Sequence, residues 1–164
     1  MSHPVKTLFV LIPLLCAMPA ITQAPAYYAI PYGPAISLEN AKRVAATAAG
    51  EARKNAWNMA IAIVDPDGTL VYYEKMDNTQ LGSAKVAVDK ARSAALFKRP
   101  TKVFQDRLAS GGVGLNVLGL EGAVPVEGGV PLMIDGHIVG AIGVSGDTSE
   151  HDALCAQVGA DALK

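Results

Sequence analysis

VPLMIDGHIVGAIGVS, residues 130–145, contains two apolar runs that are joined by Asp135-Gly136. Asp-Gly between two apolar runs is the strongest short-range signal for a β-hairpin. We therefore predict one strand over residues 130–134 and a second over residues 137–145. Side chains alternate between the two faces of a strand, which places one set together: His137, Val139, Ala141, Gly143 and Ser145.

A second hairpin is predicted upstream of the first. Residues 59–64 are wholly apolar, which suits a central strand covered on both faces. The turn Asp65-Pro66-Asp67-Gly68 follows, where proline presets φ and glycine accepts a positive φ. Residues 70–76 then return as a strand. Two hairpins imply an antiparallel sheet.

Helical patterns fill most of the remaining chain. Ser37 is a good N-cap for a helix that ends near Asn55, and residues 82–97 carry a stripe of alanines at helical spacing. Thr101 is expected to cap a short helix, and Ser149 the last one. Helices that cover an antiparallel sheet define an α/β fold of the α+β type.

Length and charge limit the classes of function. The chain has 164 residues and a net charge of -1, so it forms one domain and lacks the basic face that binding to nucleic acid requires. Residues 1–24 have the pattern of a cleaved signal peptide, with an apolar run too short to span a bilayer comfortably. We expect a secreted or periplasmic protein with no stable membrane span after cleavage.

The predicted mature chain has two parts. Residues 25–36 are rich in proline and tyrosine and should form an extended arm. This arm either lies on a surface, such as that of a neighbouring subunit, or is a loose linker. Residues 37–164 form the domain, in which Cys155 is the only cysteine and is expected to be buried in a helix.

Glu127 is the most unusual candidate for chemistry. It lies between valines and just before Gly128 and Gly129. Glycines let backbone amides face a ligand without side chains in the way. Glu127 is therefore either a general acid or base, or a structural carboxylate that accepts hydrogen bonds and fixes a bend.

Cationic side chains gather near the end of the second long helix. Arg92 and Arg99, together with Lys90 and Lys98, could hold carboxylates or simply form a solvated surface. His137 and His151 are the only histidines of the predicted mature chain, and either imidazole could bind a metal.

Several ordered motifs resemble the GlcG/HbpS family of haem-binding and glycolate-utilisation accessory proteins. The two strongest are Val126-Glu127-Gly128-Gly129-Val130-Pro131 and Gly140-Ala141-Ile142-Gly143-Val144-Ser145-Gly146. Three further stretches agree, and the similarity runs from about residue 37 to the C-terminus. The further stretches are residues 61–65, 90–97 and 99–104.

The resemblance implies a profilin-like or PAS-like fold and a homo-oligomer, from tetramer to octamer. In secreted members it also implies haem binding, with roles in haem and iron sequestration, degradation or sensing through a sensor kinase. One type of iron contact in the family is a threonine hydroxyl, so the candidate iron ligands are Thr101 and His137. The propionates would lie on Arg92 and Arg99.

Two other classes of function stay open. One is an enzyme that uses Glu127 as acid or base on a carboxylate or hydroxy-acid substrate, with the glycine amides as oxyanion donors. The other is a non-catalytic sensor or partner module, by analogy with other profilin-like folds.

Overall fold

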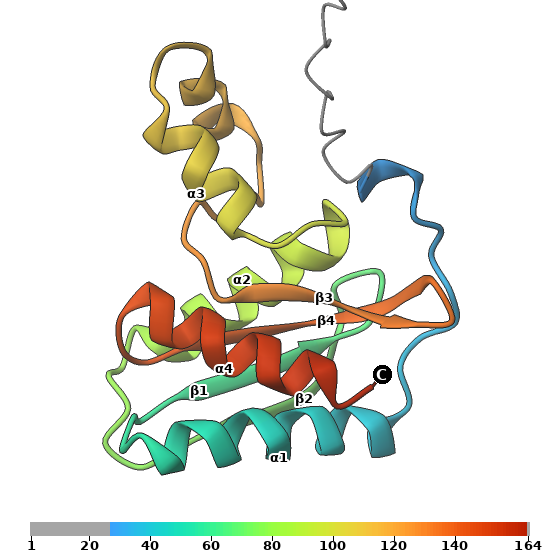
Figure 1. Cartoon of the computed structure of the whole chain (residues 1–164), viewed down its shortest axis with the longest axis vertical. Helices are drawn as coiled ribbons and strands as arrows, with labels where there is room; N and C mark the ends of the chain where they lie inside the picture. Colours follow the sequence, from blue (N-terminus) through green and yellow to red (C-terminus); the bar gives the residue numbers. More distant parts are fainter. Residues whose placement is uncertain (1–26, 164) are drawn as a thin grey trace, which may run out of the picture.

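The computed structural model describes residues 27–163 (Figure 1). The predicted signal peptide, residues 1–24, lies outside the described residues. Both hairpins and the long helices form close to where the sequence predicts them. The elements, in chain order, are η1 (Tyr27–Ala29), α1 (Leu38–Lys54), β1 (Ala60–Val64), β2 (Leu70–Lys75), α2 (Ser83–Leu96), α3 (Lys102–Ala109), η2 (Gly112–Gly119), β3 (Gly129–Ile134), β4 (His137–Ser145) and α4 (Ser149–Asp161).

The four strands form one antiparallel sheet in the order β2-β1-β4-β3. The two hairpins meet through β1 and β4, which are therefore the central strands, and β3 is left at one edge. Each central strand is apolar because helices cover both of its faces. The predicted α+β fold with an antiparallel sheet is confirmed.

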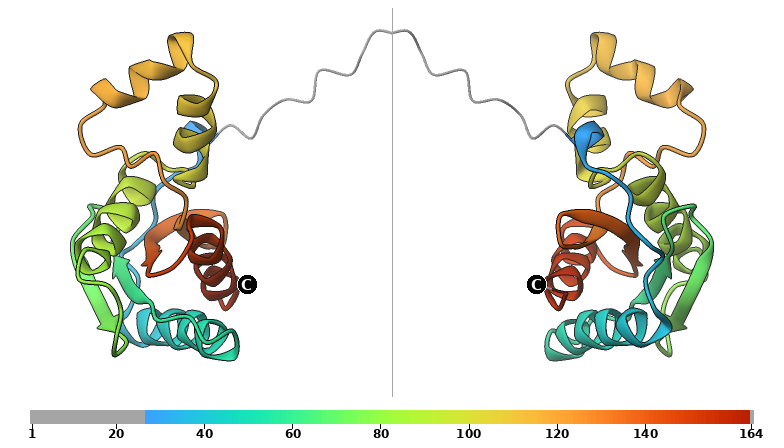
Figure 2. Two further views of the ribbon diagram at one scale, coloured as in Figure 1. Left: turned by 90° about the vertical axis from the view of Figure 1, so that its left-hand side faces the viewer. Right: turned by 90° about the vertical axis from the view of Figure 1, so that its right-hand side faces the viewer.

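Helices cover the two faces of the sheet unequally (Figure 2). On one face α1 and α4 pack side by side over the larger core cluster, which includes Ile61, Ile142 and Cys155. On the other face α2 lies flat on β1 and β4 through small residues such as Ala87 and Ala91. The alanine stripe that predicted this helix is the surface that lets it approach the sheet so closely.

Val139 does not lie on the predicted face of β4. The pairing of β3 with β4 shifts between Leu132 and Met133, which leaves Val139 as an extra residue in β4. Such a bulge interrupts the alternation of side chains. Val139 therefore packs with Ile142 in the larger cluster, whereas Ala141 faces α2.

The chain just before α1 lies against its own β4. The amide of Ile138 donates to the carbonyl of Pro31, and the amide of Gly33 donates to the carbonyl of Ile138, both at 2.9 Å. The amide of Ile36 donates to the carbonyl of Val139 in the same way, at 2.8 Å. This part of the predicted arm thus extends the sheet beside β4, beyond the end of β1. The surface on which the arm lies is therefore part of the same chain.

A projection of α3 and η2 stands away from the sheet (Figures 1 and 2). Part of this projection is the glycine-rich stretch 110–114, within which η2 begins at Gly112 and continues to Gly119. Within residues 27–163, no helix is both long enough and apolar enough to cross a bilayer.

Candidate functional site

A groove follows the outer edge of β3, between this strand, α4 and the start of α3. Its main part encloses about 550 Å³ and continues into a smaller hollow of about 210 Å³. Both parts share Tyr27, Pro100, Val130 and Gln157. A largely apolar cleft of several hundred Å³ is typical of small-molecule sites. The apolar lining also includes Val103, Ala153 and Leu154 in the main part, and Ile30, Pro131, Met133 and Ala160 in the hollow.

Glu127 lies in this groove and is buried. Its backbone amide donates to Oε1 of Gln105 at 2.8 Å, and Nε2 of Gln105 donates to Oε1 of Glu127 at 3.4 Å. The Gln105 side chain, on α3, therefore fixes both the backbone and the carboxylate of Glu127. Gln105 is a site residue that no sequence motif indicated.

Gly128 and Gly129 both line the groove, and close packing against Lys90 also requires them to lack a side chain. A Cβ on Gly128 would lie 2.8 Å from Nζ of Lys90, and a Cβ on Gly129 would lie 2.4 Å from the carbonyl oxygen of Lys90. The two glycines thus let the chain pass directly over Lys90 on α2. The amide of Gly129 donates to Oγ1 of Thr101 at 3.0 Å, so it is not free to bind a ligand.

Thr101 is fully buried beneath this glycine pair. Its amide donates to the carbonyl of Gly129, and its hydroxyl accepts from the Gly129 amide, each at 3.0 Å. Thr101 is the N-cap residue of α3, as predicted, but its hydroxyl makes no capping hydrogen bond. The structure therefore brings Thr101, Glu127 and the two glycines together.

The other predicted residues lie outside the groove. Nε of Arg92 donates to the carbonyl of Gly68 in the β1–β2 turn, at 3.1 Å. Nε of Arg99 donates to the carbonyl of Phe97 at 2.8 Å. His137 lines a separate hollow beside the start of α1. As iron or propionate contacts, these residues stay predictions, but they do not converge on one site.

Arg99 and Lys98 instead hold the N-terminal segment. The guanidinium of Arg99 lies 4.8 Å from the centre of the Tyr28 ring, and Nζ of Lys98 lies 4.2 Å from that of Tyr32. Nζ of Lys98 also donates to the carbonyl of Ile30 at 2.8 Å. These cation–π contacts account for Lys98 and Arg99 without a bound anion.

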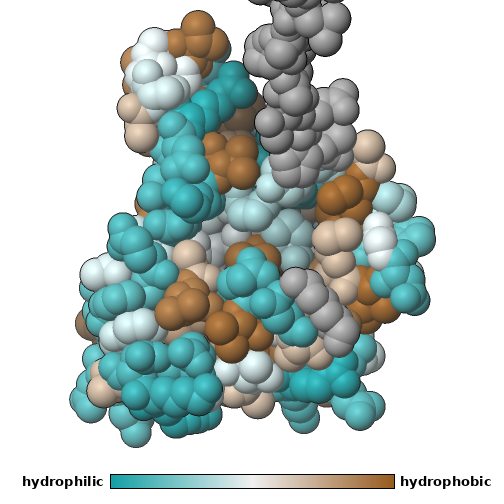
Figure 3. All heavy atoms as spheres, in the orientation of Figure 1, coloured by the Kyte–Doolittle hydropathy of each residue, from teal (hydrophilic) through white to brown (hydrophobic). Residues whose placement is uncertain are grey.

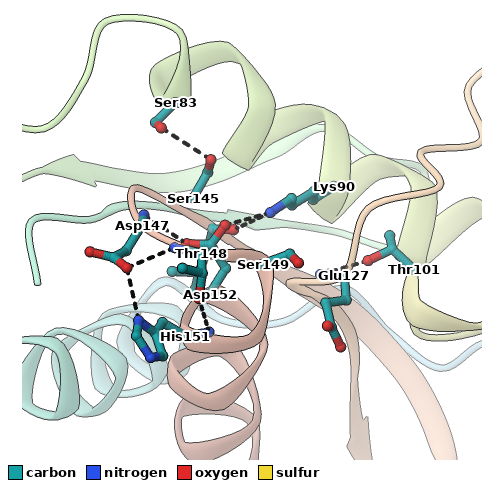
Figure 4. A network of polar contacts seen from close by, with 12 residues as sticks. Ser83, Lys90, Thr101, Glu127, Ser145, Asp147, Thr148, Ser149, His151 and Asp152 are labelled. Atoms are coloured by element: carbon teal, nitrogen blue, oxygen red, sulfur yellow. Dashed lines mark hydrogen bonds and ion pairs between the residues drawn. The ribbon is translucent and has the colours of Figure 1, made fainter. Parts of the chain in front are cut away.

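Lys90 is not part of the predicted basic surface, because it is buried (Figure 4). Its Nζ donates to Oδ2 of Asp152 at 2.7 Å and to the carbonyl of Val144 at 3.2 Å. Burial raises the pKa of the Asp152 carboxyl, and the nearby ammonium of Lys90 opposes that rise. The pair joins α2 to α4 directly behind the glycines.

His151 contacts Asp147 and Trp57, and it does not line the groove. Its Nδ1 is 2.8 Å from Oδ1 of Asp147, and its ring stacks on Trp57 with 3.8 Å between ring centres. Bonds from the Thr148 amide and from His151 lower the pKa of Asp147.

Thr148, and not the predicted Ser149, is the N-cap of α4, because its side chain accepts from the His151 amide.

The described residues include no cluster of three or more His, Cys, Asp or Glu side chains placed to hold a metal ion. The groove does contain a phenol, Tyr27, and a thioether, Met133. Two lysines, Lys98 and Lys102, also line it.

Comparisons with known proteins converge on one group. The model of the family described as "Haem degrading protein HbpS-like" matches residues 36–161. Protein GlcG of Escherichia coli (strain K12) is 37% identical over 110 residues, which are 67% of this chain and 81% of GlcG.

Two solved structures are similar in both sequence and fold. A double mutant of HbpS from Streptomyces reticuli is 26% identical, with a TM-score of 0.73, over 94% of this chain and 99% of that one. A structure described as a PduOC:haem complex is 27% identical, with a TM-score of 0.71, over 79% of this chain and 96% of that one.

Proposed function

This chain belongs to the HbpS-like family, and from that premise we propose that it binds haem in the groove between β3, α4 and the start of α3. The family's description refers to haem degradation, and a structural relative is described as a haem complex. The observation in this chain that carries the proposal is the groove itself. Its apolar walls and its size suit a flat, largely apolar ligand.

The chemistry of the groove fits the parts of haem. Val103, Val130 and Leu154 would contact the porphyrin, since they supply the apolar walls. Of the two lysines in the groove, Lys102 is the one that would bind a propionate, because Lys98 already holds the N-terminal segment. Lys102 forms an exposed pair with Asp106 at 2.8 Å, and such pairs are weak. The carboxylates of Glu127 and Glu150 also act on its charge. Haem bound there would supply an iron that accepts an axial ligand.

We propose sequestration of haem outside the cytoplasm as the role of this site. The location rests on the predicted signal peptide, residues 1–24. Neither described histidine lines the groove, so the site differs from the histidine-ligated pockets that hold haem for electron transfer or oxygen binding. Degradation of haem and signalling to a sensor kinase stay predictions of the family resemblance.

The first test is a titration of the protein with hemin, followed in the Soret region. Leu154→Glu places a charge on the apolar wall and should weaken binding about tenfold or more, equivalent to about 1.4 kcal/mol. Leu38→Glu is the matched control, since Leu38 is similarly exposed but lies on α1, outside the groove. Equal affinities for the two variants would refute the groove, and a featureless titration would refute haem binding.

The same titration separates the groove from the sequence-predicted site. Arg92→Ala and His137→Ala should leave haem affinity unchanged, because both side chains lie outside the groove. A large loss in either variant would move the site to those residues.

The enzyme alternative retains only part of its predicted machinery. Glu127 lines the groove, but of the two predicted glycine donors the amide of Gly129 is bonded to Thr101. This amide therefore cannot act as an oxyanion donor without breaking a bond that shapes the site. Turnover of a hydroxy acid that Glu127→Gln abolishes would favour this alternative.

A further inference from the structure

Three tyrosines of the N-terminal segment have different surroundings. Tyr28 is 72% exposed and its ring lies on Arg99. The hydroxyl of Tyr32 donates to the carbonyls of Ala95 and Leu96, at 3.0 and 3.2 Å. Tyr27 alone lines the groove, and it lines both the main part and the smaller hollow.

The side chain of Tyr27 is not committed to another polar contact. Among residues 27–163, no hydrogen bond from its hydroxyl is found, whereas hydrogen bonds hold the backbone from Tyr27 to Ile30. The carbonyl of Tyr27 accepts from the amide of Ile30 at 3.3 Å, and Lys98 holds the Ile30 carbonyl. The segment therefore brings a free phenol to the junction of the two parts of the groove.

A phenolate oxygen is an established axial ligand of haem iron, and oxygen donors suit ferric iron better than the softer thioether sulfur of Met133 does. We propose that Tyr27 is the axial ligand of ferric haem in this groove. The inference rests on the proposed function. On binding, the phenol releases its proton to solvent and the oxygen donates an electron pair to the iron, which stays ferric.

The N-terminal segment would then place Tyr27 at the haem iron. Tyr32, Lys98 and Arg99 act as positioning residues, since they fasten the segment that carries Tyr27 to the end of α2. This assignment also accounts for Lys98 and Arg99, which hold the segment that carries the ligand.

The test compares ferric haem complexes of the wild type, Tyr27→Phe and Tyr28→Phe by absorption and resonance Raman spectroscopy. Tyr28→Phe is the matched control, because it removes the adjacent hydroxyl outside the groove. The wild type and Tyr28→Phe should show a phenolate-to-iron charge-transfer band and enhanced tyrosinate ring modes. Tyr27→Phe should lose both signals and bind haem about tenfold more weakly.

The outcomes separate this inference from the proposed function. Haem binding by Tyr27→Phe with an unchanged spectrum would overturn the ligand assignment and leave the groove proposal standing. A wild type that binds no haem would overturn both. Tyr27→His should replace the phenolate signals by those of an imidazole-ligated haem, and a spectrum unaffected by that change would also overturn the assignment.

Discussion

Lys90 and Asp152 form a buried ion pair directly beneath Gly128. Each side chain is at most 3% exposed, and the two lie 2.7 Å apart. Removal of one partner leaves a charge without compensation in the interior, which costs about 3–5 kcal/mol, whereas an apolar replacement of both can be neutral.

We therefore expect Lys90→Met to lower the free energy of unfolding by about 3 kcal/mol or more, and Lys90→Met with Asp152→Leu to recover most of the loss. Urea denaturation measures both. Lys85→Met is the control, since its pair with Asp89 is exposed on the same helix and should contribute at most about 0.5 kcal/mol. Additive losses in the double variant would contradict this account.

Cys155 makes stability depend on pH in the alkaline range. Burial raises the pKa of its thiol to about 11, from an ordinary value of 9.0. Between these values the folded chain retains a proton that the unfolded chain has released, so this contribution is complete below pH 9 and is lost as the pH rises towards 11.

The expected result is a fall in the free energy of unfolding between about pH 9 and 11 that is smaller in Cys155→Ala, as measured by urea denaturation at each pH. Native Cys155 should also resist a thiol reagent at pH 8 and react once the chain is unfolded. Rapid reaction of the native protein would show that the thiol is accessible.

At the scale of elements, the contact between α2 and β4 depends on a bare backbone at Gly143. A Cβ there would lie 2.0 Å from the carbonyl oxygen of Ala87 and 2.5 Å from the amide nitrogen of Ala91. Gly143→Ala should therefore push the helix from the sheet and cost about 1–3 kcal/mol.

Gly50→Ala is the matched control for that substitution. Gly50 lies within α1, and a Cβ there meets no atom within 4 Å. The change should stabilise the protein by about 0.5–1 kcal/mol, because alanine favours a helix more than glycine does. Thermal or urea unfolding measures the free energy of unfolding of both variants. Equal changes in that free energy would refute the close contact of α2 with β4.

For the whole molecule, the projection of α3 and η2 carries a group of exposed apolar side chains. Figure 3 shows apolar side chains at its tip. The exposed fractions of Val113 and Leu118 are 72% and 68%, and Leu115 and Leu120 on the same segment are also exposed. Several exposed apolar side chains on one segment are typical of association sites.

We propose that copies of this chain associate through the projection, in line with the predicted homo-oligomer. Leu115→Asp with Leu118→Asp should lower the molecular mass measured by light scattering after size-exclusion chromatography. Leu81→Asp is the control, since Leu81 is 88% exposed but precedes α2. An unchanged mass in the double variant would exclude the projection as the interface.

The sequence alone determined the elements whose signals are local. Asp135-Gly136 and the apolar runs beside it specify the β3–β4 hairpin, since a turn and its strands are set by neighbouring residues. The bulge at Val139 has no such local signal, because it arises from pairing with β3 and not from the alternation of β4.

Only the tertiary structure decided which residues share a site. Lys90 was expected with the surface cations because its partner, Asp152, is 62 residues away. Tyr27 reaches the groove because the segment after it folds back along β4, and His137 is excluded because the hairpin places it elsewhere. A local pattern specifies an element, but a binding site is assembled by long-range packing, which brings together side chains that no spacing in the sequence relates.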